Sequence, residues 1–467
     1  MKIFDTLTAK EEDLDTSRIV RIYVCGVTVY DESHIGHART IIVFDTLRRF
    51  LESQKIKVKF VQNFTDVDDK IINRAKQENV PPLELSSKFI TRYFEDFDRL
   101  NIKRADDYPK ATDHIKEMLE LIKNLIEKNF AYVSKNGIYF SVSKFKEYGK
   151  LSKKKTEDLI SGARIEIDET KKDPLDFALW KFASDQPKWQ SPWGDGRPGW
   201  HIECSAMSLK YLGENFEIHG GGRDLIFPHH ENEIAQSESY TGKNFAKIWM
   251  HVGMVTINDE KMSKSLGNTK SIEHVLKNWG PNIIRLFCLS GHYSKPIDYS
   301  EDSFKETIIK WRQVENCYFE LIGAPEKSDT QNRLKFFDDM TVNIKKEFDD
   351  ALKSDFNTPL ALSVFFKFIK ELNNLAASES LTITISNIVL PTLKMMLEVT
   401  GLKITEITDK EKIVIEDLIK KRNMFREQKQ YQKADEVRKQ ISDMGVVLID
   451  HKTRTILLKQ EKIGTED

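Results

Sequence analysis

The chain lacks several features that would each define a class of protein. It has only four cysteines in 467 residues, Cys25, Cys204, Cys288 and Cys317, and no C-x-x-C spacing. This excludes a disulfide framework and predicts reduced thiols, with Cys288 and Cys317 as small buried hydrophobic residues. No apolar run approaches the roughly 18 residues of a membrane span, and the first residues lack the apolar core of a secretory signal. We therefore expect a cytoplasmic protein that has no membrane partner.

An excess of charge of one sign is also absent. The 72 lysines and arginines nearly balance the 73 aspartates and glutamates, which gives a formal net charge of -1. A polyanionic partner would therefore have to be held by local basic patches and not by the field of the whole molecule. The chain is 40% hydrophobic and longer than one hydrophobic core usually organises, so we expect two to four folded domains.

The N-terminal pattern predicts the beginning of a parallel sheet. Residues 21–26 are β-rich and end in glycine, residues 37–51 carry apolar side chains at helical spacing, and residues 57–62 form a second β-rich run. Strand, helix and strand in this order begin a βαβ unit. Residues 81–129 are helical in pattern. The predicted class is α/β: a Rossmann-like parallel-sheet domain with an insertion, followed by an α-helical bundle and a small C-terminal α/β unit.

Changes of pattern along the chain predict the domain boundaries. The Rossmann-like domain is expected in two halves, at 1–130 and 199–245, around an insertion at 131–198; a further region at 246–302, a helical bundle at 303–400 and a final unit at 401–467 follow. In the bundle, Thr358 is the expected N-cap of a helix and Pro359 its first residue. The final unit contains a basic helical stretch at 420–439 and a β-like run at 446–449.

Two motifs point to phosphate chemistry. The first, His34-Ile35-Gly36-His37, lies where the first predicted strand gives way to a helix. A helix N-terminus offers unpaired N–H groups to a phosphate, Gly36 permits close approach of the backbone, and the imidazoles of His34 and His37 can donate to phosphate oxygens. The four residues taken alone are better explained as two ordinary surface histidines.

The second motif is Lys261-Met262-Ser263-Lys264-Ser265, followed by Leu266-Gly267-Asn268. The ammonium groups of Lys261 and Lys264 can neutralise the charge that develops as pyrophosphate leaves a triphosphate. On its own this is also a plain solvated basic loop. Both motifs occur in the chain order that a single phosphoryl-handling site requires, and together they favour a nucleotide-binding enzyme.

With these two motifs the chain resembles the class I aminoacyl-tRNA synthetases, whose paired signatures H-I-G-H and K-M-S-K-S are both present unaltered. The stretches at 23–31, 65–70, 198–207 and 219–233 narrow the resemblance to the cysteinyl-tRNA synthetases. The resemblance implies an ATP-dependent ligase that converts L-cysteine to cysteinyl-adenylate and transfers it to the 3′ end of tRNA(Cys). It implies catalytic roles for His34, His37, Lys261 and Lys264, with Mg²⁺ accompanying ATP.

A metal site is the third candidate. If Pro228 lies in a first helical turn, His229 and Glu233 are one turn apart on the same face, which is a familiar spacing for zinc. Cys25 and Cys204 would complete a tetrahedral set, although buried core cysteines are the default in an unknown protein. The resemblance implies one Zn²⁺ held by these four residues. Whether His230 or Glu231 also enters the metal shell is left open.

Such a metal would allow the enzyme to select cysteine over serine. Exchanging one small group in an apolar pocket changes binding by only roughly 1–3 kcal/mol, whereas discrimination of about 10⁴ requires about 5.5 kcal/mol. A thiophilic ion that binds the substrate thiolate as an extra ligand would supply the difference.

The resemblance implies further binding residues. Gly36, Gly221, Asp224 and Lys264 would bind ATP, and Thr65, Trp200 and His219 would line the amino acid pocket. Without the resemblance, the glycines at 220–222 are equally well a structural turn and Trp200 an ordinary core residue.

The C-terminal half is expected to bind tRNA. The resemblance implies stem contacts at 246–302, an anticodon-stem-binding bundle at 303–400 and an anticodon-binding unit at 401–467, in a monomeric enzyme. The basic stretch at 420–439 by itself favours a solvated face. Residues 454–458 lack the tryptophan that similar enzymes present to anticodon bases, so another contact must replace it. A ligase that joins cysteine to an aminosugar is the nearest alternative, and a zinc-stabilised RNA-binding protein without catalysis is a more distant one.

Overall fold

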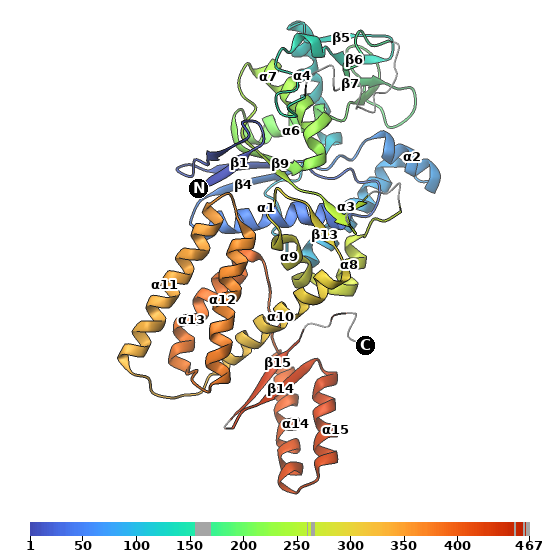
Figure 1. The fold of residues 1–467 in the computed structure, drawn as a ribbon. Coiled ribbons are helices and arrows are strands. Elements are labelled where there is room, and N and C mark those ends of the chain that lie inside the picture. Colours follow the sequence, from blue (N-terminus) through green and yellow to red (C-terminus); the bar gives the residue numbers. More distant parts are fainter. Residues whose placement is uncertain (155–169, 259, 263–266, 453, 461–462, 464–467) are drawn as a thin grey trace. The chain divides into compact units, whose positions relative to one another are not determined.

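The computed structural model describes residues 1–154, 170–258, 260–262, 267–452, 454–460 and 463 (Figure 1). The chain divides into two compact units. Unit 1 contains Met1–Ile272 and two short returning segments, His292–Asp298 and Lys353–Phe356. Unit 2 contains Glu273–Gly291, Tyr299–Leu352 and Asn357–Asp467.

Unit 1 is built on a four-stranded parallel sheet in the order β10-β9-β3-β4. Its strands are β3 (Val20–Val24), β4 (Val58–Gln62), β9 (Phe216–Gly222) and β10 (Ala246–Val252). Because all four strands run in the same direction, their carboxyl ends meet at one edge. That edge is where ligands bind in open α/β sheets.

Helix α1 (Ile35–Ser53) follows β3 and packs on this sheet. A Cβ atom at Gly220 would lie 2.1 Å from the ring of Phe44, so only glycine lets α1 approach β9 this closely. The predicted strand, helix and strand at 21–26, 37–51 and 57–62 are thus confirmed as β3, α1 and β4.

The helical prediction for residues 81–129 is correct at its two ends and wrong in the middle. Helices α3 (Pro82–Arg99) and α4 (Ile115–Glu127) are separated by an extended stretch and the 3₁₀ turn η1 (Ala111–His114). The chain leaves α3 through Asn101, which has a positive φ of 56°. It then runs beside the end of β4, where Val61 bridges Asp107 and Phe64 bridges Lys110. Pairing with the sheet competes successfully with local helical propensity here.

The remaining parts of unit 1 are smaller. A separate antiparallel sheet contains β5 (Ala131–Val133), β6 (Gly137–Phe140), β7 (Phe177–Phe182) and β8 (Gly196–Pro198). The other elements are β1 (Lys2–Asp5), β2 (Lys10–Asp13), α2 (Asp69–Glu78), α6 (Ile202–Leu212), α7 (Glu231–Thr241), β11 (Val255–Ile257) and β12 (Glu260–Lys261). Strand β13 (Ile297–Tyr299) pairs with β11 in a three-stranded sheet of order β12-β11-β13.

Unit 2 is mainly helical. Its first helices are α8 (Ile272–Trp279), α9 (Pro281–Ser290), α10 (Glu301–Ile322), α11 (Gln331–Lys353), α12 (Thr358–Ala377) and α13 (Ile383–Thr400). The chain ends in the helices α14 (Asp409–Glu427) and α15 (Tyr431–Asp443) and the hairpin β14 (Val446–Asp450) and β15 (Thr455–Lys459). The predicted α-helical bundle and small α/β unit are both present.

The N-cap predicted for α12 is wrong by one residue. Asn357 is the N-cap, since its side chain accepts a hydrogen bond from the backbone N–H of Leu360 at 3.0 Å. Thr358 is therefore already helical, and Pro359 lies in the first turn, where its missing N–H has no cost.

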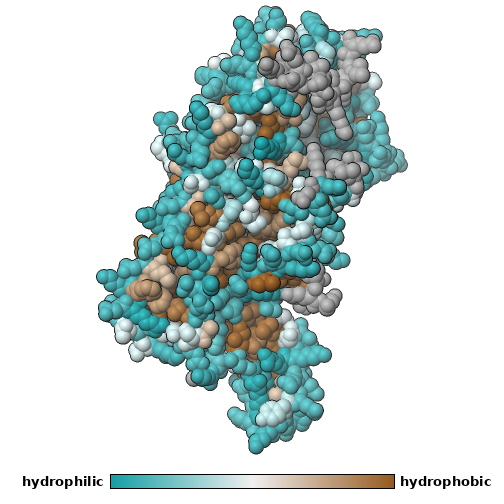
Figure 2. All heavy atoms as spheres, in the orientation of Figure 1, coloured by the Kyte–Doolittle hydropathy of each residue, from teal (hydrophilic) through white to brown (hydrophobic). Residues whose placement is uncertain are grey.

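Helix α13 is the one described helix that is long and apolar enough to cross a membrane by length and composition alone. Core helices of folded proteins pass the same test. Ile385, Val389, Leu393 and Met396 on α13 are fully buried inside the structure, so α13 supplies part of a bundle core. The face shown in Figure 2 is mainly hydrophilic, with hydrophobic residues in separate groups.

Candidate metal centre and nucleotide site

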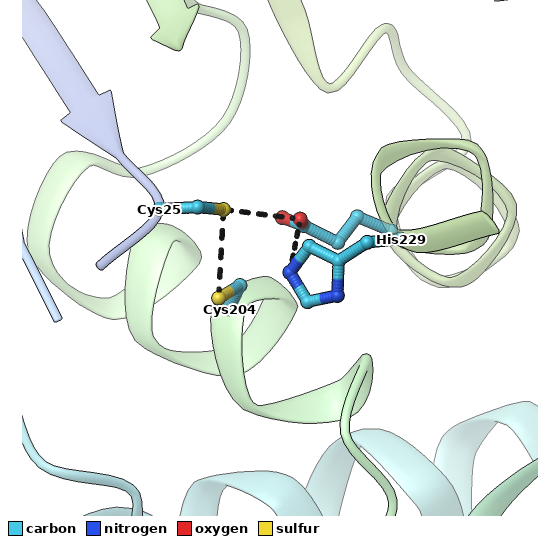
Figure 3. Close-up of side chains that lie close together, drawn as sticks. Cys25, Cys204 and His229 are labelled. Carbon is cyan, nitrogen blue, oxygen red and sulfur yellow. Dashed lines mark hydrogen bonds and ion pairs between the residues drawn. The ribbon is translucent and has the colours of Figure 1, made fainter. Parts of the chain in front are cut away.

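Four side chains from three segments meet at the carboxyl edge of the parallel sheet (Figure 3). Cys25 directly follows β3, and Cys204 lies in the first turn of α6. His229 lies in the helical turn just before α7, and Glu233 lies in the first turn of α7. The Cys25 sulfur is 3.7 Å from the Cys204 sulfur and 3.3 Å from Glu233 Oε1, and His229 Nε2 is 3.0 Å from the same oxygen. The structure thus brings together all four ligands expected from the sequence.

The helical start that carries His229 and Glu233 differs from a regular first turn. Residues Ile226–His230 form a π-helical turn that leads into α7, and Phe227 within it has extended backbone angles. His229 and Glu233 nevertheless lie on one face, as their contact shows. Two sulfurs, an imidazole nitrogen and a carboxylate oxygen within 4.8 Å of one another are a donor set that fits a metal ion.

Burial shapes the protonation of this cluster. All four residues are at most 7% exposed. Burial raises the pKa of Cys25 well above its ordinary value. Burial also opposes ionisation of Cys204, but hydrogen bonds with Cys25 and His229 lower its pKa to about 6. For His229 burial favours the neutral form, yet Glu233 and Cys204 raise its pKa to about 10. Buried charges of this density are paired or coordinate metals.

A second set of residues fixes the candidate ligands. His201 Nδ1 lies 3.0 Å from His229 Nδ1, and His219 Nε2 lies 2.8 Å from Glu233 Oε2. Such outer contacts orient metal ligands. His201, the N-cap of α6, was missed as a functional residue from the sequence, because its contact with His229 depends on how α6 packs against α7.

His230 and Glu231 have different surroundings. Glu231 is buried and accepts hydrogen bonds from the backbone N–H groups of Gly149 and Ser152 at 2.9 and 2.8 Å, so its carboxylate anchors that turn. His230 Nδ1 lies 2.8 Å from His251 Nε2, and His251 Nδ1 lies 2.8 Å from the hydroxyl of Thr6. Burial lowers the pKa of His230 well below its ordinary value and that of His251 to about 3, so both imidazoles are neutral.

Of the three residues expected to line the amino acid pocket, Trp200 and His219 contact members of this cluster, and Thr65 contacts the residue before Cys204. The Trp200 ring lies 4.5 Å from the ring of His229, between centroids. His219 is fully buried and stacks on Trp249 at 4.4 Å. The Thr65 hydroxyl donates to Glu203 Oε2 at 2.8 Å, and Glu203 immediately precedes Cys204. Glu203 was not singled out from the sequence. Burial raises the pKa of its carboxyl well above the ordinary value.

The H-I-G-H motif forms the N-terminal cap of α1. His34 Nδ1 accepts from the backbone N–H groups of Gly36 and His37 at 3.2 and 3.4 Å, and His34 N–H donates to His37 Nδ1 at 3.4 Å. The expectation of unpaired N–H groups is therefore wrong for Gly36 and His37. Because both Nδ1 atoms accept, a neutral ring carries its proton on Nε2. The two rings stack, with centroids 3.7 Å apart, and both can donate through Nε2.

Met262 of the K-M-S-K-S motif lies next to the H-I-G-H motif. A Cβ atom at Gly36 would be 3.0 Å from the His34 ring and 3.3 Å from the Met262 methyl group, so Gly36 lies between them. Just beyond the motif, Ile35 N–H donates to the Lys270 carbonyl at 3.0 Å. Lys264 and the side chain of Lys261 lie outside the described residues.

The glycine-rich end of β9 joins the metal cluster to the candidate nucleotide site. A Cβ atom at Gly221 would lie 2.9 Å from the His230 ring, so glycine is required for that packing. Asp224 follows in the 3₁₀ turn η3 (Arg223–Leu225) and is exposed at the surface.

Comparison with known proteins identifies the family. Residues 12–308 match the family described as tRNA synthetases class I (C) catalytic domain, and residues 347–404 match the DALR domain. The cysteine–tRNA ligase of Thermodesulfovibrio yellowstonii is 49% identical, over 98% of this chain and 99% of its own, and that of Carboxydothermus hydrogenoformans is 46% identical, over 96% and 98%.

A solved structure agrees with this fold. Mycobacterium tuberculosis methionyl-tRNA synthetase in complex with methionyl-adenylate superposes with a TM-score of 0.62 at 15% identity, over 82% of this chain and 90% of that chain. The parallel sheet, the H-I-G-H and K-M-S-K-S sequence motifs and these sequence matches show that the chain belongs to the cysteine–tRNA ligases of the class I aminoacyl-tRNA synthetases.

Proposed function

We propose that this chain activates L-cysteine with ATP and transfers it to the 3′ end of tRNA(Cys), and that it selects cysteine with a bound Zn²⁺. The observation that carries the proposal is the buried set of Cys25, Cys204, His229 and Glu233, which lies at the same sheet edge as the H-I-G-H helix. We further propose that the protein acts as a monomer in the cytoplasm, as expected from the sequence.

The spacing of the sulfurs supports zinc. Zinc–sulfur bonds are about 2.3 Å long, so two sulfurs of a tetrahedral site lie about 3.8 Å apart. Cys25 and Cys204 place their sulfurs 3.7 Å apart. When bound, Zn²⁺ would bind the thiolate of cysteine much more strongly than the hydroxyl of serine. This difference would provide the discrimination of about 10⁴ between cysteine and serine that a purely steric pocket does not reach.

The residues of the chain position the other parts of the reaction. Thr65, Trp200 and His219 enclose the amino acid beside the metal cluster, and Gly221 and Asp224 receive the adenosine, with the Asp224 carboxylate available to the ribose hydroxyls. The Nε2–H groups of His34 and His37 donate to the triphosphate that Mg²⁺ accompanies, and Lys261 and Lys264 neutralise its charge. In this arrangement the cysteine carboxylate attacks the α-phosphorus in line, pyrophosphate leaves, and cysteinyl-adenylate remains.

In the second step the terminal ribose 2′-OH of tRNA attacks the carbonyl of the adenylate, and AMP leaves. The regions at 246–302, 303–400 and 401–467 hold the tRNA stem, the anticodon stem and the anticodon in this proposal. The presence of these regions favours tRNA over an aminosugar as acceptor.

Three measurements on the purified protein test the function. Cysteine-dependent exchange of pyrophosphate into ATP tests activation, elemental analysis tests for one zinc per chain, and charging of tRNA(Cys) tests transfer, with an aminosugar as the alternative acceptor. We expect exchange with cysteine to exceed exchange with serine by about 10³-fold or more. Serine activation within about tenfold of cysteine would overturn the metal-based selection, and absence of exchange would overturn the activity.

A further inference from the structure

Arg39 lies on α1 two residues after His37 and is fully buried. Its guanidinium donates to four backbone carbonyls. One terminal nitrogen donates to Gly253 and Met254 at 2.8 and 3.0 Å, and the other donates to His292 and Lys295 at 3.2 and 2.6 Å. Arg39 therefore connects two chain segments that are about forty residues apart to the helix that begins with the H-I-G-H motif.

These two segments cross in direct backbone contact. The N–H of Gly253 donates to the Tyr293 carbonyl at 2.7 Å, and the N–H of Ile297 donates to the Met254 carbonyl at 3.1 Å. A Cβ atom at Gly253 would lie 2.2 Å from the Lys295 carbonyl oxygen, so only glycine fits at this crossing. We call the contact between residues 253–254 and 292–295 the backbone crossing. It brings the four carbonyls to the same guanidinium.

The K-M-S-K-S motif begins a few residues after the backbone crossing. Strand β11 starts at Val255 and pairs with β12, where Thr256 lies opposite Lys261. Beyond the motif the chain returns to α1: Ile272 N–H donates to the Ser33 carbonyl at 2.9 Å, and Ser271 forms a β-bridge with His34. The segment that contains the two motif lysines is thus attached upstream to Arg39 on α1 and downstream to the residues that begin and cap α1.

We propose that Arg39 is a positioning residue for cysteine activation: it fixes the root of the β11–β12 hairpin to α1, so that the K-M-S-K-S lysines and the H-I-G-H imidazoles act on the same triphosphate. This inference rests on the proposed function. Arg39 itself touches no substrate. The chain downstream of the motif, at residues 270–272, is held by backbone hydrogen bonds, whereas upstream of the motif the side chain of Arg39 makes the connection to α1.

The chemistry of the side chain explains why arginine is needed. A guanidinium presents up to five N–H donors in a fixed plane and can serve four acceptors, while a lysine ammonium has three donors at one point. A lysine at residue 39 keeps the charge, but its three donors lie on a single nitrogen and cannot reproduce the two terminal nitrogens that reach the two segments separately. Misplacement of a catalytic group by about 1 Å is enough to lower a rate by about 100-fold.

The test compares Arg39→Lys with Arg49→Lys. Arg49 is a matched control because it lies on the same helix, is also buried, and binds Asp45 and the Asn101 carbonyl at 2.8 and 2.7 Å, away from the backbone crossing. Cysteine-dependent pyrophosphate exchange gives kcat and the KM values for ATP and cysteine. Transfer to tRNA is measured separately, from cysteinyl-adenylate formed beforehand on the enzyme.

We expect Arg39→Lys to lower kcat for exchange by about 10- to 100-fold while the KM for cysteine and the rate of transfer stay within about twofold of the wild type. Arg49→Lys should leave all these values within about twofold. A loss of the same size in both variants would show a general structural effect and overturn the proposal, as would a normal kcat in Arg39→Lys. If the wild type itself shows no cysteine-dependent exchange, the proposed function fails instead.

A second variant disturbs the backbone crossing itself and leaves Arg39 unchanged. Gly253→Ala places a methyl group against the Lys295 carbonyl and separates the backbone crossing without touching Arg39. It should reproduce the kcat loss with an unchanged KM for cysteine, and it provides the test should Arg39→Lys fail to fold. Normal exchange by folded Gly253→Ala, established by its thermal unfolding, would overturn the proposal.

Discussion

The sulfurs of Cys25 and Cys204 lie 3.7 Å apart although 179 positions separate these residues along the chain. Cys25 follows β3, whose hydrogen bonds to β9 continue through Cys25 N–H to the Gly220 carbonyl at 3.0 Å. Cys204 lies on α6, which directly precedes β9 and packs against β3. The parallel pairing of β3 with β9 is therefore what assembles the two sulfurs.

We predict that Cys204→Ser loses the metal. An alcohol is a much weaker zinc ligand than a thiolate, and loss of outer contacts alone lowers metal affinity by about 10- to 100-fold, so the loss of a ligand should exceed that range. Cys288→Ser is the control, because Cys288 is also a buried cysteine but lies on α9 outside the cluster. Elemental analysis after dialysis against a chelator measures the result. Retention of one metal per chain by Cys204→Ser would contradict the assignment.

His219→Gln should weaken metal binding without abolishing it. The imidazole of His219 holds the second oxygen of Glu233 at 2.8 Å and so fixes the carboxylate that would bind the metal. Such outer partners contribute about 10- to 100-fold in affinity, which competition with a chelating dye would measure. His114→Gln is a suitable comparison, since His114 is buried but contacts the Lys110 carbonyl elsewhere in unit 1. Equal affinity in both variants would argue against this role for His219.

Lys264→Ala should lower the rate of cysteine-dependent pyrophosphate exchange by about 100-fold or more, the scale of losing a preorganised charge stabiliser. Lys264 lies outside the described residues. This prediction therefore depends on the sequence motif and on Met262, the motif residue that lies close to Gly36. The same change at Lys277, an exposed residue of α8, is the control for loss of one positive charge. An unchanged exchange rate in Lys264→Ala would remove Lys264 from the proposed mechanism.

The sequence was sufficient for the parts of the site that depend on short-range pattern. The spacing of His229 and Glu233 indicated a shared helical face, and the β-rich runs around α1 indicated a parallel sheet. The contacts of His201, Glu203 and Arg39 could not be derived in this way. Each joins segments whose proximity depends on the order of strands in the sheet, which residue periodicity does not encode.

Local signals also competed in ways that the sequence did not resolve. Both Asn357 and Thr358 are good N-cap residues, and the choice of Asn357 depends on its hydrogen bond to Leu360. At the start of α1, His34 caps the helix with its own imidazole, a role that histidine seldom has, and so the N–H groups expected to be open were already paired.

Acid should destabilise the fold through the buried histidines. Burial lowers the pKa of His251 to about 3 from an ordinary 6.5. Because the folded-state pKa is the lower one, the stabilising contribution is fully present above pH 6.5 and is lost as the pH falls toward 3. At about pH 5 the wild type should have lost about 2 kcal/mol of unfolding free energy from this residue.

His251→Gln removes this titration and keeps a neutral hydrogen-bonding side chain beside Thr6 and His230. Urea unfolding at about pH 7.5 and about pH 5 should show a smaller loss for the variant than for the wild type, by about 2 kcal/mol. The comparison concerns the change between the two pH values, so any constant effect of the substitution cancels. Equal losses would show that His251 does not titrate in this range.

Removal of the residues after 404 should separate activation from transfer. This segment contains α14, α15 and the β14–β15 hairpin, and it contacts α10 through Glu320, which binds His451 and Arg454 at 2.7 and 2.8 Å. Glu320 is buried in the full-length chain, and truncation removes both of the partners that its carboxylate binds. The shortened chain should therefore also carry Glu320→Gln, and full-length Glu320→Gln serves as its control.

We expect the shortened chain to keep cysteine-dependent exchange within about twofold of this control, because every described residue of the candidate metal and nucleotide sites precedes the truncation. Its kcat/KM for tRNA(Cys) should fall by about 10- to 100-fold, the equivalent of about 1.4–3 kcal/mol at about tenfold per 1.4 kcal/mol, which is the scale of one lost base contact. Residues 454–458 contain no tryptophan, so a loss of this size would show that the unit recognises tRNA by other contacts. Undiminished charging would instead place tRNA recognition entirely in residues 1–404.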